Sequence, residues 1–94
     1  MATVHLVITG RVQGVGYRDA LRIEAQSRGV AGWVRNRRDG SVEAILHGTQ
    51  DAVDTTIAWA RQGPALARVL QVRMRPQCDD RANGYSDFEV RPTA

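Results

Sequence analysis

Apolar and polar positions alternate at the start of the chain, in residues 3–9. One row of this segment consists of Val4, Leu6 and Ile8, and the other consists of His5, Val7 and Thr9. A period of two residues, in a stretch rich in β-branched side chains, predicts a strand that turns one face to a core.

After the first strand, apolar residues recur at intervals of three or four residues instead of two, and this spacing predicts helices. Residues 17–28 form the first predicted helix, and Gly29 follows as a residue that ends helices. Its helical spacing is carried by Ala20, Leu21, Glu24 and Ala25. Thr49 can cap a second helix, and Gly63-Pro64 ends it. The apolar face of the second helix consists of Val53, Thr56, Ile57 and Ala60.

Two further strands are predicted between the helices. Residues 30–36 and 41–47 have strand-like patterns, and Asp39-Gly40 between them is a strong hairpin signal. The rest of the chain is predicted to be a strand over residues 68–74, a polar loop over residues 77–86 and a short last strand over residues 87–90 that carries Phe88.

The predicted order of elements is β-α-β-β-α-β with a short extra strand at the C-terminal end. This order indicates an α+β, ferredoxin-like sandwich, in which an antiparallel sheet carries both helices on one face. The length of 94 residues fits one core, so we expect residues 1–94 to form a single domain. A fold of this kind does not by itself indicate a function.

Composition narrows the class of protein without naming it. A hydrophobic fraction of 43% and a charged fraction of 24% are ordinary for a globular protein. No apolar run approaches the roughly 20 residues that span a membrane, and no secretory leader opens the chain, so we expect a cytoplasmic protein without a membrane partner. Cys78 is the only cysteine, and its acidic neighbours favour an incidental loop thiol over a nucleophile.

The net charge of +3 favours an anionic partner, and a glycine-rich loop offers a place for one. Gly14 and Gly16 lie between the first predicted strand and helix, with Arg18 just inside the helix. Glycines allow successive backbone N–H groups to point inward, and a helix N-terminus adds partial positive charge. The alternative is that these glycines only satisfy turn geometry. The loop lacks the lysine of a Walker A motif and the third glycine of a dinucleotide fingerprint.

Asn36 is a second candidate, because it ends a predicted strand just before the hairpin. An amide can donate and accept hydrogen bonds at once, and could therefore hold a water molecule in a fixed orientation. The alternative is a turn residue, which is a common role of asparagine. Arg35, Arg37 and Arg38 flank this position, and solvated charge is their default interpretation.

Taken together, the two segments resemble the signatures of the acylphosphatase family. Residues 10–18 read GRVQGVGYR and resemble the first signature, while residues 32–36, GWVRN, and the following DGSVE of residues 39–43 resemble the second. Gly63-Pro64 and the later Ala67-Arg68-Val69 also match, and the resemblance covers nearly the whole chain in order. Tyr17 stands where phenylalanine is common, and its hydroxyl needs a partner. Arg28 and Leu70 depart from the expected apolar and polar residues, outside the signatures.

The resemblance implies a ferredoxin-like enzyme that hydrolyses acyl phosphates to a carboxylate and inorganic phosphate. It implies that the phosphoryl group is bound by the backbone of Gln13, Gly14, Val15, Gly16, Tyr17 and Arg18. It also implies that Arg18 clamps the phosphoryl oxygens and that Asn36 holds the attacking water. The substrate itself would take the proton, and no metal or cofactor is implied. We expect a monomer whose partners are the small acyl phosphate and the phosphate product.

Two other functions share features with this sequence. The same order of elements underlies RNA-binding RRM domains, which stack bases on aromatic residues of the central strands. Residues 42–46 contain no aromatic residue, so the sequence predicts no nucleic-acid partner. Acylphosphatase-like domains also occur inside larger carbamoyl-transfer maturation proteins, and the short chain favours the free-standing enzyme.

Overall fold

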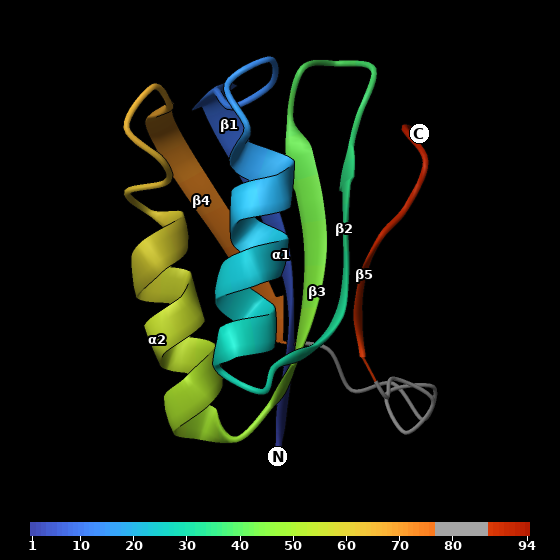
Figure 1. Ribbon diagram of the computed structural model, residues 1–94, viewed down its shortest axis with the longest axis vertical. Coiled ribbons are helices and arrows are strands. Elements are labelled where there is room, and N and C mark those ends of the chain that lie inside the picture. Colours follow the sequence, from blue (N-terminus) through green and yellow to red (C-terminus); the bar gives the residue numbers. More distant parts are fainter. Residues whose placement is uncertain (77–86) are drawn as a thin grey trace.

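A computed structural model describes residues 1–76 and 87–94, and within them five strands and two helices. The elements are β1 (Ala2–Arg11), α1 (Tyr17–Ser27), β2 (Ala31–Asn36), β3 (Val42–Gly48), α2 (Gln50–Ala60), β4 (Arg68–Pro76) and β5 (Phe88–Val90). Both helices cover the same face of one sheet (Figure 1). The α+β, ferredoxin-like prediction is therefore confirmed.

The sheet has the strand order β4-β1-β3-β2-β5. The four long strands pair antiparallel, so that β1 lies between β3 and β4, and β3 lies between β1 and β2. The short β5 joins the edge of β2 in the parallel direction, with Phe88 opposite Gly32. The predicted antiparallel sheet thus carries one added parallel edge, whose direction the sequence pattern did not specify.

The core lies between the sheet and the two helices, as the alternation in the first strand predicted. Leu6 and Ile8 of β1 are fully buried, and they pack in one cluster with Leu21 of α1 and Val53 of α2. Phe88 of β5 belongs to the same cluster. Burial of these side chains is the main force that holds the helices on the sheet.

Local signals set the helix boundaries close to the predicted ones. Thr49 caps α2, because its hydroxyl oxygen accepts a hydrogen bond from the Ala52 N–H at 3.2 Å. Gly29 and Gly63 follow the two helices with φ of 71° and 69°, a conformation that other residues rarely adopt. Arg28 lies just past the last residue of α1, where its Nε pairs with Glu24 at 3.0 Å and the side chain is exposed.

The β1–α1 loop and the β2–β3 hairpin lie at the same end of the sheet (Figure 1). This placement follows from the topology, because β1 and β2 both pair antiparallel with β3. They therefore run in the same direction, and their C-terminal ends lie at the same end of the sheet. The two segments that resemble family signatures are therefore close in space. The predicted loop over residues 77–86, with Cys78, lies outside the described residues.

Gly32 in β2 is required by close packing against the neighbouring strand. Its φ is 130°, and a Cβ atom there would lie 1.9 Å from the carbonyl oxygen of Ile45. We expect Gly32→Ala to lower the free energy of unfolding by roughly 3 kcal/mol or more, through backbone strain and displacement of β3. Urea denaturation measures this change.

Gly48→Ala is the matched control, because Gly48 lies in the adjoining strand and an added Cβ would meet only ordinary contacts from 3.6 Å outward. Its stability should stay within about 1 kcal/mol of wild type. Equal losses for the two variants would show that close approach at Gly32 is not the cause.

Neither helix described here is long and apolar enough to cross a membrane.

Candidate active site

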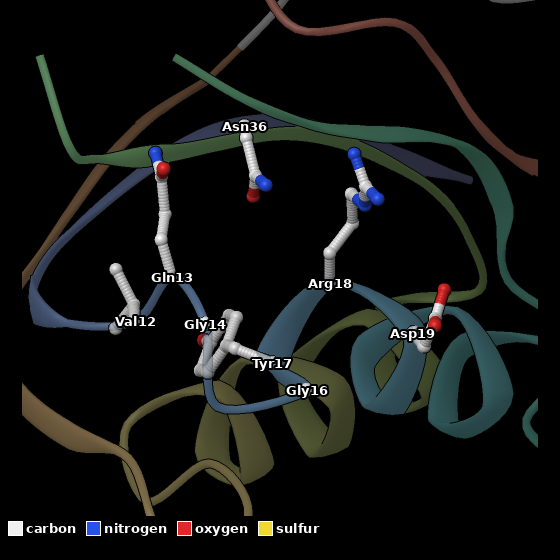
Figure 2. A pocket seen from close by; sticks show the side chains of 8 residues that line it. All are labelled: Val12, Gln13, Gly14, Gly16, Tyr17, Arg18, Asp19 and Asn36. Carbon is white, nitrogen blue, oxygen red and sulfur yellow. The ribbon is translucent and has the colours of Figure 1, made fainter. Parts of the chain in front are cut away.

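One pocket of about 230 Å³ opens where the β1–α1 loop faces the end of β2. Figure 2 shows that Gln13 and Arg18 reach into it from the loop and α1, while Asn36 reaches into it from the opposite wall. Its full lining is Val12, Gln13, Gly14, Gly16, Tyr17, Arg18, Asp19 and Asn36. The fold thus brings the two candidate segments into one concave site.

Backbone N–H groups of the loop are available to a ligand. Gly14 and Gly16 have φ of 74° and 79°, the left-handed conformation that builds anion-binding nests. Within the described part of the chain, no hydrogen bond uses the N–H groups of residues 13–16. Gly16 is the N-cap of α1 and supplies no capping side chain, so the first N–H groups of the helix are also free. The loop can therefore bind an anion through its backbone.

Tyr17 anchors this loop to the core. The side chain is 1% exposed, and its hydroxyl donates a hydrogen bond to the Ala60 carbonyl oxygen at 2.8 Å, at the end of α2. Burial raises the pKa of the Tyr17 hydroxyl, so it remains a neutral donor. The ring also lies against Trp59, with 5.7 Å between centroids. The partner that the Tyr17 hydroxyl was expected to need is thus a backbone carbonyl oxygen of the protein, and the start of α1 is fixed to α2.

Asn36 points to the helix side of the sheet because of strand alternation. Val34, two residues earlier on the same face, is fully buried in the core, and Asn36 lies opposite Val42 at the end of the ladder. Its side-chain oxygen Oδ1 is buried and has no hydrogen-bond partner among the described residues. A buried acceptor without a donor costs about 1–3 kcal/mol, so this atom is poised to accept a hydrogen bond from a bound molecule.

The hairpin next to Asn36 is held by short polar contacts. Asp39 Oδ1 accepts hydrogen bonds from the Ser41 hydroxyl at 2.6 Å and from the Ser41 N–H at 2.9 Å. These two hydrogen bonds hold the pKa of the Asp39 carboxyl below its ordinary value. The two hydrogen bonds to the Asp39 carboxylate tie the turn together next to the end of β2.

Arg18 differs from Arg35 in what its guanidinium contacts. Among the described residues, no carboxylate forms an ion pair with Arg18. Arg35 Nε instead donates to Glu43 at 2.7 Å, and Glu43 also accepts from His5 Nε2 at 2.7 Å. Partial burial raises the pKa of Glu43, but the hydrogen bonds and charges of His5 and Arg35 lower it by more. Arg18 is left with its charge uncompensated beside the pocket.

The sequence anticipated most of the pocket and missed two of its residues. Val15 is the one predicted loop residue outside the lining, and its side chain packs against the core. Val12 and Asp19 line the pocket without having been predicted. Val12 is a core residue, and an acid in the first turn of a helix is common enough that Asp19 carried no specific signal. No histidine is among the described residues that line the pocket.

Comparison with known proteins places the whole chain in one family. The acylphosphatase family profile matches residues 4–90. An acylphosphatase of Thiobacillus denitrificans is 52% identical over 91 residues, which cover 97% of this chain and 98% of that protein. An acylphosphatase of Pyrobaculum arsenaticum is 48% identical over 94 residues, which cover 99% of this chain and 97% of that protein.

A solved structure supports the same family. The crystal structure of acylphosphatase from Bacillus subtilis superimposes with a TM-score of 0.90 at 31% identity, covering 97% of this chain and 99% of that one. The chain belongs to the acylphosphatase family, a family of hydrolases that act on acyl phosphates.

Proposed function

We propose that the pocket hydrolyses the carboxyl-phosphate bond of a small acyl phosphate, with water as the second substrate and a carboxylate and inorganic phosphate as products. In this proposal the loop of residues 13–18 binds the phosphoryl group and Asn36 holds the attacking water. The observation that carries it is the buried, unpartnered Oδ1 of Asn36 in the same pocket as the free N–H groups of the loop.

The charge distribution of the pocket favours a phosphoryl group. The free N–H groups of residues 13–16 and of the start of α1 supply hydrogen-bond donors without any deprotonation. Arg18 adds a fixed positive charge and a planar fork that can bind two phosphoryl oxygens through parallel hydrogen bonds. These groups stabilise the negative charge of the phosphoryl group in the transition state.

Asn36 is suited to orient the water molecule. Its Oδ1 accepts one hydrogen of the water, which leaves a lone pair of the water free to face the bound phosphoryl group. Alignment of a nucleophile with a bound electrophile accelerates a reaction without acid or base. The carboxylate is a good leaving group, and an oxygen of the substrate's own phosphoryl group takes the proton of the water.

An RNA-binding function is less well supported by the open face of the sheet. Trp33 lies there, but the guanidinium carbons of Arg35 and Arg91 stand 4.8 and 4.9 Å from its ring centroid. The side chain is also 7% exposed, so its ring is covered where a base would stack. We infer that the partners of this protein are small acyl phosphates and phosphate, and that it acts as a cytoplasmic monomer.

The proposal is tested with benzoyl phosphate, an acyl phosphate, and with p-nitrophenyl phosphate, an ester, in buffer that contains EDTA. Benzoyl phosphate should be hydrolysed rapidly, and the ester at least about 10³-fold more slowly, because its leaving group is poorer and the proposed mechanism uses no general acid to protonate it. Inorganic phosphate should inhibit competitively. Equal rates on both compounds, or activity that EDTA removes, would contradict the proposed mechanism.

A further inference from the structure

The side chain of Gln13 connects the two walls of the pocket. Its amide nitrogen Nε2 donates one hydrogen bond to the Arg37 carbonyl oxygen at 2.7 Å and another to the Ser41 carbonyl oxygen at 2.9 Å. A glutamine amide has two N–H donors, and carbonyl oxygens only accept. Both donors are therefore used on the hairpin, and this fixes which end of the amide faces it.

Arg37 and Ser41 are the two residues where the β2–β3 hairpin closes. The Arg37 N–H donates to the Ser41 carbonyl oxygen at 2.8 Å, so Gln13 adds a second tie at the same place. Asn36 directly precedes Arg37 and lies opposite Val42, which directly follows Ser41. The contacts of Gln13 therefore hold the backbone on both sides of the position that carries Asn36.

The backbone of Gln13 belongs to the opposite wall. Its N–H is one of the free groups of the loop, and its side chain reaches across to the hairpin beside Asn36 (Figure 2). One residue thus joins the phosphate loop to the element that carries the water-holding amide. The turn residues Arg38, Asp39 and Gly40 are exposed, so burial alone does not fix the hairpin against the loop.

We propose that Gln13 is a positioning residue that acts through Asn36: its side chain sets the distance between the phosphate loop and the amide that holds the water. This inference rests on the proposed function, because it assigns a role within the same reaction. A shift of about 1 Å between a nucleophile and its target can reduce a rate by about 10². Loss of the tie should therefore reduce turnover and leave the anion site, formed by backbone and Arg18, intact.

The first test compares Gln13→Met with Gln26→Met. Methionine has a similar length without donors, and Gln26 is a matched control because its Nε2 donates to the Phe88 carbonyl oxygen at 2.9 Å, away from the pocket. With benzoyl phosphate, Gln13→Met should lower kcat about 10- to 100-fold and leave KM and the Kd of inorganic phosphate within about twofold. Gln26→Met should change none of these constants. An unchanged kcat in Gln13→Met would overturn the inference.

The second test is a double-mutant cycle with Asn36→Ala. If Gln13 acts through Asn36, adding Gln13→Met to Asn36→Ala should lower kcat by less than about twofold. A further tenfold loss would mean that Gln13 acts independently, and would overturn the inference. If Gln13→Met does not fold, Gln13→Asn replaces it in both tests, because the shorter amide cannot reach both carbonyl oxygens and stays polar. Absence of turnover in folded wild-type protein would overturn the proposed function, and this inference with it.

Discussion

Replacement of Arg18 with alanine is expected to lower kcat/KM for benzoyl phosphate by about 10³ or more, and to weaken the binding of inorganic phosphate at the same time. The reason is the uncompensated charge of Arg18 beside the free N–H groups of the loop. A guanidinium that clamps the phosphoryl group contacts it in the ground state and in the transition state, so affinity and turnover should both fall. Steady-state kinetics and calorimetric titration with phosphate measure the two effects.

Arg22→Ala is the control for net charge. Arg22 lies one turn further along α1, outside the pocket, where its guanidinium donates a weak 3.4 Å hydrogen bond to the side chain of Gln26. The substitution removes the same charge from the same helix. It should leave kcat/KM for benzoyl phosphate and the Kd of inorganic phosphate within about twofold of wild type. Comparable losses in the two variants would indicate general electrostatic attraction in place of a clamp at Arg18.

Replacement of Asn36 with alanine is expected to separate turnover from binding. The kcat should fall by about 10²–10³, because the water loses its acceptor, while the Kd of inorganic phosphate should stay within about twofold. Removal of the buried, unpartnered Oδ1 also removes an unsatisfied acceptor. The thermal midpoint should therefore be unchanged or higher than that of wild type.

Thermal unfolding, phosphate titration and benzoyl phosphate kinetics on one preparation of Asn36→Ala check all three expectations. A wild-type kcat in this variant would show that Asn36 does not hold the attacking water. Loss of phosphate binding together with turnover would instead place Asn36 among the groups that bind the phosphoryl oxygens.

Much of the fold could be predicted because its signals are local. The alternation of Leu6 and Ile8 with His5, Val7 and Thr9 marked the buried face of β1, and Asp39-Gly40 marked the hairpin. Thr49 capped α2 as expected. The parallel direction of β5 could not be predicted in this way, because a strand of three residues has too short a pattern to specify its neighbour.

The contacts of the candidate site were harder to predict because they join residues far apart in the chain. The sequence indicated that the Tyr17 hydroxyl needs a partner, but the Ala60 carbonyl that accepts its hydrogen bond lies 43 residues away. The Gln13 amide likewise reaches a hairpin 24 and 28 residues further on. The buried state of Asn36 Oδ1 depends on how segments far apart in the chain pack at the end of β2, and such packing has no local signal in the sequence.

The most direct test of the proposed reaction is the hydrolysis of benzoyl phosphate by wild type, Arg18→Ala and Asn36→Ala, side by side in EDTA and with phosphate affinity determined for each. We expect rapid turnover by wild type, loss of turnover and phosphate affinity in Arg18→Ala, and loss of turnover alone in Asn36→Ala. A folded wild-type protein that binds phosphate without hydrolysing benzoyl phosphate would contradict the proposed reaction, and would leave the pocket as an anion-binding site.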